Sequence, residues 1–190
     1  SARIDKNFKR FDDEYYRIEG VFQEYGADWP GDKEGRALLS FVSHYKISGK
    51  KIPCMEQLLE KMPEKTNEFL YFDAPVKDVI HEQQLSGHSW LLRGLCEYYE
   101  KYGRDEILDI INRIVENLYF PLCGKICDYP VSRDAENDGG VDGHTAESCG
   151  GWLLSTDTCC AFMSIDGLSH AYKITRDGRI KALLDEMAEA

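Results

Sequence analysis

Three short stretches that each combine tryptophan, glycine and ionisable residues constrain this fold more than any other feature of the sequence. They span residues 29–36, 83–90 and 144–152. Each stands immediately before a long segment whose apolar residues recur at helical spacing. All three tryptophans of the chain lie in these stretches, at intervals of about sixty residues. That interval suits a pair of antiparallel helices with their connections, so the sequence predicts repeated helical hairpins.

Apolar periodicity predicts helices along most of the chain. The expected helices span residues 6–20, 33–47, 54–61, 64–71, 90–102, 105–118, 152–172 and 179–190. Asp32 is the expected N-cap of the second helix, and Pro63 is expected beyond the end of the third. Gly103 has the position of a left-handed residue that ends a helix. No convincing alternation of apolar and polar residues indicates a strand, so we expect a nearly all-α fold.

Buried inner helices that alternate with amphipathic outer ones are typical of an (α/α) toroid, with the tryptophan stretches at one mouth. An ordinary helical bundle is the alternative. A length of 190 residues favours a single domain, 1–190. Residues 122–143 form a long loop rich in Asp and Gly, of the kind that is functional or mobile. The last expected helix shows no C-cap signal, which indicates part of a longer polypeptide.

The charge of the chain limits the classes of partner that it can bind. A formal net charge of −11 argues against binding nucleic acid or an anionic membrane through bulk electrostatics. No apolar run approaches the roughly 20 residues that span a bilayer, and no signal peptide is visible. Seven cysteines without the spacing of a disulfide scaffold fit a reducing compartment. We therefore expect a cytoplasmic protein, or a secreted one if a leader has been removed.

The three tryptophan stretches indicate a carbohydrate site. Flat apolar sugar faces stack on indoles, while carboxylate, imidazole and guanidinium groups bind hydroxyls. The alternative is that each indole simply packs between helices. The candidate substrate-binding residues are Trp29, Glu34, Arg36, His88, Trp90, His144 and Trp152.

Glycoside hydrolysis needs an acid that protonates the leaving oxygen and a nucleophile or base on the opposite side. The catalytic candidates are Glu147, Glu136 and Asp32, with Glu147 the first choice. Glu147 and Cys149 are two residues apart on a predicted loop, where both can turn toward one zinc ion. The alternative makes Glu147 a first-turn carboxylate and Cys149 a packed thiol.

Two passages resemble the six-hairpin glycosidases, and in particular the β-L-arabinofuranosidase group, glycoside hydrolase family 127. They are residues 87–95 with the tyrosine-rich helix that follows, and residues 146–149 with the helices that follow. The resemblance covers roughly the last hundred residues. It implies that the chain is a fragment of a six-hairpin barrel, an α/α toroid. It also implies a zinc ion held by a Glu-x-Cys pair, which Glu147 and Cys149 match, and by a later Cys-Cys pair that includes the nucleophile. The position expected for that later pair falls beyond Ala190, because Cys159 and Cys160 follow too soon.

These observations lead to a first hypothesis, a glycoside-hydrolase-like helical toroid domain that acts on or binds an oligosaccharide, with zinc as the possible cofactor. The alternatives are a non-catalytic helical module that binds carbohydrate or serves as a scaffold, and a sugar isomerase or epimerase on the same toroid. Whether the chain is an enzyme stays open at this point. The toroid hypothesis predicts that Asp32, His88 and Glu147 lie on one side of the domain, at the N-terminal ends of inner helices.

Overall fold

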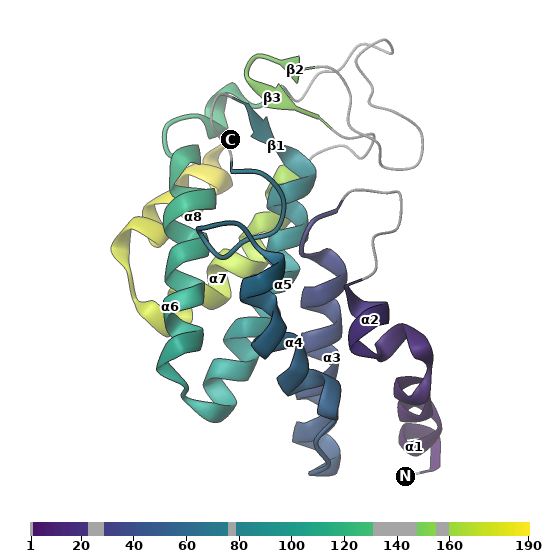
Figure 1. The fold of residues 1–190 in the computed structure, drawn as a ribbon. Coiled ribbons are helices and arrows are strands. Elements are labelled where there is room, and N and C mark those ends of the chain that lie inside the picture. The colour runs from purple at the N-terminus through teal and green to yellow at the C-terminus, as the bar shows by residue number, and fades with distance from the viewer. Residues whose placement is uncertain (1, 23–28, 76–78, 131–147, 155–159) are drawn as a thin grey trace.

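The computed structural model describes residues 2–22, 29–75, 79–130, 148–154 and 160–190 (Figure 1). Within these ranges the chain is mostly helical, with one small three-stranded sheet. The predicted all-α class is therefore confirmed. None of the described helices combines the length and the apolar character needed to cross a membrane.

Three long helices lie side by side: α3 (Asp32–Ser48), α5 (Glu82–Tyr102) and α7 (Ser164–Thr175). The first two run in the same direction, because residue numbers rise together along their contact. A Cβ atom on Gly31 would lie 3.3 Å from the His88 ring, and one on Gly94 would lie 3.2 Å from the Cβ atom of Leu38. The N-terminal ends of α3 and α5 are therefore adjacent.

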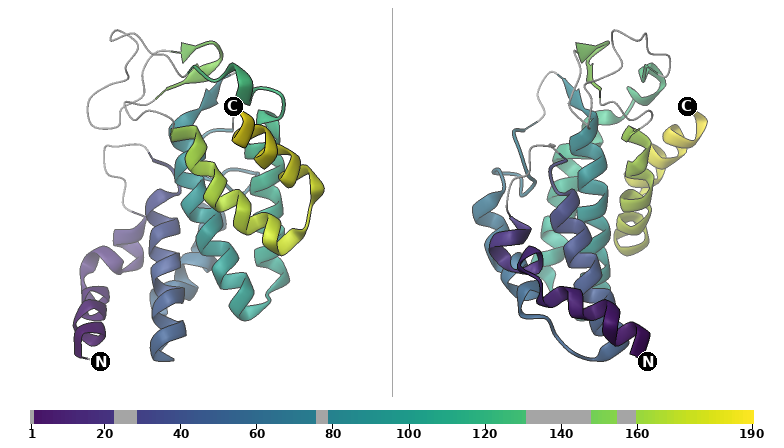
Figure 2. Two further views of the ribbon diagram at one scale, coloured as in Figure 1. Left: turned by 180° about the vertical axis from the view of Figure 1, so that it is seen from behind. Right: turned by 90° about the vertical axis from the view of Figure 1, so that its right-hand side faces the viewer.

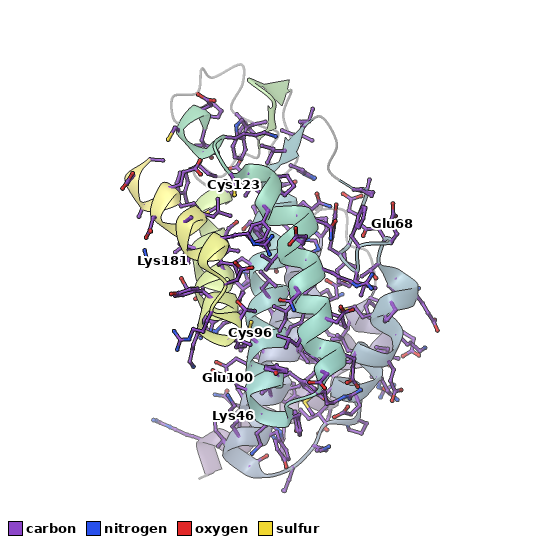
Figure 3. All side chains as sticks on the ribbon, turned by 90° about the vertical axis from the view of Figure 1, so that its left-hand side faces the viewer. Lys46, Glu68, Cys96, Glu100, Cys123 and Lys181 are labelled. Carbon is purple, nitrogen blue, oxygen red and sulfur yellow. The ribbon has the colours of Figure 1, made fainter. Side chains whose placement is uncertain are left out.

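Helix α7 runs parallel to α5 on another side of it. The Ser89 hydroxyl donates to the Met163 carbonyl at 2.6 Å and accepts from the Gly167 N–H at 2.9 Å. Near the other end of both helices, the Lys173 Nζ atom lies 2.5 Å from the Glu100 carboxylate. All three helices consequently begin at one end of the molecule and finish at the other, and Lys46 and Glu100 mark the finishing end in Figure 3.

Helices α4 (Pro53–Lys65) and α6 (Asp105–Ile114) return the chain between these parallel helices, and α8 (Gly178–Glu189) follows the last of them. The turn between α5 and α6 is tight because Gly103 adopts the predicted left-handed conformation, with φ of 64°. Tyr119, in the π-helical turn Val115–Tyr119 that continues α6, donates to the Leu85 carbonyl at 2.7 Å, so the returning chain ends beside the start of α5. Figures 1 and 2 show the resulting succession of helical hairpins.

A small sheet lies at the end where α5 begins, in the order β1-β3-β2. Its strands are β1 (Ile80–His81), β2 (Ser148–Cys149) and β3 (Trp152–Leu153). β3 pairs parallel with β1 and antiparallel with β2. The predicted helix from residue 152 is therefore wrong at its start. Gly150 and Gly151 have φ of 57° and 87° and turn the chain into a strand, and α7 begins only at Ser164.

The N-terminal prediction of one helix over 6–20 is also wrong. The chain forms α1 (Ala2–Phe8), two 3-10 helices (Lys9–Asp12 and Glu14–Tyr16) and α2 (Ile18–Val21). Asp13 and Arg17 have extended backbones, and the Asp13 carboxylate accepts from the Tyr15 N–H at 3.0 Å. This local hydrogen bond competes with the helical one and breaks the helix.

Two details around α4 differ from prediction as well. Pro63 lies inside the helix, which continues to Lys65. No separate helix follows over 64–71, because the Asn67 side-chain oxygen accepts from the Phe69 N–H at 2.9 Å and bends the chain. Of the predicted loop 122–143, residues 122–130 are described, and they include the short 3-10 helix Ile126–Asp128.

Candidate functional site

Helix α5 is covered on all sides but one. Between Glu82 and Tyr98 its only side chains that are not buried are those of Trp90, Arg93 and Glu97. Their spacing places them on one face of the helix. We call the surface formed by these three residues with Arg36 of α3 and Asp166 of α7 the open face.

Trp90 and Arg36 form one half of this surface. The guanidinium carbon of Arg36 lies 4.2 Å from the centre of the Trp90 ring, which is a cation–π arrangement. The Arg36 Nε atom lies 2.8 Å from the Asp32 carboxylate, one turn earlier in α3. The predicted N-cap role of Asp32 is wrong, because the N-cap position belongs to Gly31 and the Asp32 side chain is used to hold Arg36. Burial raises the pKa of Asp32, and the charge of Arg36 opposes that rise.

Arg93 forms the other half. Its Nη1 atom lies 2.8 Å and 2.9 Å from the two oxygens of Asp166, and its Nε atom lies 3.8 Å from Glu97. Glu97 also pairs with Lys46 of α3. Burial raises the pKa of Glu97, but Lys46 and Arg93 together hold it below its usual range. The half-buried indole is thus flanked by two arginines whose positions are set by carboxylates.

Glu34 lies in the first turn of α3, close to Asp32 in sequence. Burial raises the pKa of its carboxyl group, although backbone hydrogen bonds partly counteract this. Residues two apart in a helix point to different sides, so Asp32 and Glu34 do not form the facing carboxylate pair that glycoside hydrolysis requires.

His88 is fully buried, and both of its ring nitrogens are engaged. The Phe72 N–H donates to Nε2 at 2.9 Å, so the ring proton is on Nδ1, which lies 2.7 Å from the Gln84 carbonyl. Burial lowers the pKa of His88 to about 4. In this geometry the imidazole is a neutral structural group that joins α5 to the segment after α4. It has no nitrogen left for a sugar hydroxyl, so the predicted substrate-binding role does not fit.

The three tryptophans have different surroundings. Trp152 is only 1% exposed, and its ring meets Tyr129 edge-to-face with centroids 5.1 Å apart. Trp29 is half-buried, and its carbonyl accepts from the Asp32 N–H at 3.0 Å where α3 begins. Only Trp90 takes part in the open face as defined above.

Glu136, His144 and Glu147 lie outside the described residues, and Cys149 is described only as part of the β2 backbone. Within the described ranges, no group of three or more His, Cys, Asp or Glu side chains could hold a metal ion. The zinc site therefore stays a prediction. Asp32 and His88 do lie near one another at the end where α3 and α5 begin, since Gly31 approaches the His88 ring.

Sequence reasoning missed three consecutive polar residues in the first turn of α5, all of them buried. Glu82 accepts hydrogen bonds from the Tyr129 hydroxyl and from the Ala161 N–H, the latter at 3.1 Å. The Gln84 amide donates to the carbonyls of Phe72 and Ala74 at 2.9 Å and 3.0 Å. Between them, neither amide atom of Gln83 has a hydrogen-bond partner among the residues that the structure describes. The sequence feature that could have indicated these buried residues is a run of polar residues directly before an apolar helix.

Comparisons of the chain with protein-family models, with curated proteins and with solved structures found no match.

Proposed function

We propose that this chain is a segment of an (α/α) toroid and that it binds an oligosaccharide on the open face, at Trp90. The observation that carries the proposal is the parallel packing of α3, α5 and α7 with returning helices between them, which is the arrangement of inner helices in a toroid. Inner helices of a toroid present one face to its centre, and the open face would be that surface.

The open face has the chemistry that sugar recognition uses. An indole offers a flat apolar surface, and Arg36 occupies one side of it, so a sugar ring would stack on the other side or displace the guanidinium. Arg36 and Arg93 supply N–H donors in fixed orientations, and Asp32 and Asp166 supply acceptors. These groups match the hydroxyls around a sugar ring.

Hydrolysis of a bound sugar would need a carboxyl group that acts as an acid and a second carboxylate opposite it. Asp32 is the described candidate for this acid, because burial raises the pKa of its carboxyl group, although the ion pair with Arg36 opposes that rise. The predicted candidates for the second carboxylate, Glu136 and Glu147, lie outside the described residues. A sugar isomerase would need histidines free to act at the mouth of the toroid, and His88 is fully engaged inside the protein. We therefore favour binding, with or without hydrolysis, over isomerisation.

Calorimetric titration with β-L-arabinobiose, xylobiose, cellobiose and maltose tests the proposal. We expect at least one disaccharide to bind, and Trp90→Ala to weaken that binding roughly tenfold or more, which corresponds to about 1.4 kcal/mol. Tyr172→Ala is the matched control, since Tyr172 carries Arg176 near its ring at the far end of α7. Absence of binding to all four sugars, or equal effects of the two variants, would contradict the proposal, and the former would favour a scaffolding module.

A further inference from the structure

Arg36 is an exposed arginine whose position is fixed from two sides. Its Nε atom lies 2.8 Å from the Asp32 carboxylate, and its guanidinium carbon lies 4.2 Å from the centre of the Trp90 ring. Its terminal nitrogens, Nη1 and Nη2, have no acceptor among the residues that the structure describes. Because the side chain is 56% exposed, these two nitrogens form an accessible fork of N–H donors that is held against the indole.

Arg113 of α6 shows what is particular to this arrangement. Its Nε atom lies 2.9 Å from Asp109, one turn earlier in the same helix, so the local ion pair is the same. The Asp109 side chain is 60% exposed, however, whereas that of Asp32 is 24% exposed. A strongly exposed pair is weakened by water and gains little from being held in one geometry. Arg36, with a half-buried carboxylate and an indole beside it, is the better oriented of the two.

Arg93, the other arginine of the open face, is already occupied. Its Nη1 atom lies 2.8 Å and 2.9 Å from the two oxygens of Asp166, and its Nε atom faces Glu97. Its side chain is only 29% exposed. The protein therefore supplies acceptors for Arg93 and leaves the outer edge of Arg36 open to a ligand.

The outer edge of a guanidinium matches a carboxylate. Two parallel N–H groups bind its two oxygens at once, and such a charged pair is stronger and more directional than a hydrogen bond to a neutral hydroxyl. Among sugars, the uronic acids carry a carboxylate where the neutral hexoses carry a hydroxymethyl group. The formal net charge of −11 opposes an anion at long range, but salt screens this repulsion beyond about 8 Å, so the nearest charges decide.

We propose that the open face recognises an oligosaccharide that contains a uronic acid, with its carboxylate bound by Nη1 and Nη2 of Arg36 and its ring beside Trp90. The inference rests on the proposed function and narrows the ligand from oligosaccharides in general to acidic ones. Asp32 contacts Nε, so the ligand carboxylate does not have to displace it.

Calorimetric titration with matched pairs of sugars tests the inference. Digalacturonic acid differs from α-1,4-galactobiose, and cellobiouronic acid from cellobiose, only in oxidation at C6. We expect at least one acid to bind roughly tenfold or more tightly than its neutral counterpart. Arg36→Gln should abolish this preference, and Arg36→Lys should remove most of it, because an ammonium group keeps the charge without the fork. Arg113→Gln is the matched control and should leave the preference unchanged.

Three results would overturn the inference: equal affinity for acidic and neutral sugars, a preference that persists in full in either Arg36 variant, or one that is lost equally in Arg113→Gln. All three variants replace exposed side chains, so melting curves like that of the unaltered protein should show that each is folded. Neutral sugars that bind through Trp90 without any preference for the acids would leave the proposed function intact. An unaltered protein that binds no sugar would refute both.

Discussion

The buried side chain of His88 should make the stability of the fold depend on pH. Its folded pKa is about 4, whereas an unfolded histidine titrates near 6.5. Between these two pKa values the unfolded state binds a proton that the folded state does not bind. The free energy of unfolding must therefore fall as the pH falls from about 6.5 to about 4. We expect a loss of about 2 kcal/mol between pH 7 and pH 5 from this residue alone. Urea denaturation at several pH values measures it.

The matched variants are His88→Gln and His170→Gln. Glutamine at position 88 can still donate and accept but does not titrate between pH 7 and pH 5, so the pH dependence should flatten even if the protein is less stable. His170 is only half-buried, and its replacement should leave most of the slope. The raised pKa values of Asp32 and Glu34 act in the opposite direction, because the folded state gains those protons first on acidification. A slope that survives in His88→Gln would assign the effect to another group.

At the scale of the elements, close packing between α3 and α5 depends on glycine. A Cβ atom on Gly35 would lie 2.2 Å from the backbone nitrogen of Leu91, a distance that requires the helices to separate. We expect Gly35→Ala to reduce the free energy of unfolding by about 3 kcal/mol or more, measured by chemical denaturation. Gly178→Ala, in α8, should be neutral or slightly stabilising, since no atom lies within 4 Å of the added Cβ. A Gly35→Ala protein as stable as Gly178→Ala would mean that α3 and α5 are not packed this closely.

The elements also show what sequence patterns can predict. Long helices with a clear apolar stripe, and the turn at Gly103, were predictable because their periodicity and their capping glycine are local properties. The strand at Trp152 was not, since two residues are too few for any periodicity and their pairing partner, β1, is far away in sequence. The break in the N-terminal helix depends on one hydrogen bond from the Tyr15 N–H to the Asp13 side chain. The sequence shows only that residue 13 is polar, which does not predict this hydrogen bond.

In the candidate site, too, local features were predictable from the sequence and contacts between distant segments were not. Arg36 and Trp90 were recognised singly by residue type, but their contact depends on the register that Gly35 and Gly94 set between two helices. His88 was misjudged because its role depends on the Phe72 N–H, which lies in an irregular segment. Gln83 and Gln84 are indistinguishable in sequence, and only their three-dimensional surroundings separate them.

At the scale of the whole molecule, α5 is the centre of the packing. It contacts α3 and α7 along its length, and it also touches α6 and, through Tyr98 and Glu56, α4. By contrast, no side chain between Lys6 and Tyr16 is buried. Because of this difference in burial, the free energy of local opening should be much lower in the N-terminal segment than in α5.

Native-state hydrogen exchange should reveal that difference. We expect the amides of Leu91 to Cys96 to exchange only through global unfolding, because no local opening can expose a helix that its neighbours enclose. The amides of residues 6–16 should exchange through local fraying, several orders of magnitude faster. Added denaturant gives the internal control, since exchange in α5 should accelerate with the full slope of global unfolding and exchange at the N-terminus should hardly respond. If α5 exchanged freely while α7 or α3 stayed protected, the parallel helices would not form one cooperative unit built around α5, and the toroid interpretation would lose its structural basis.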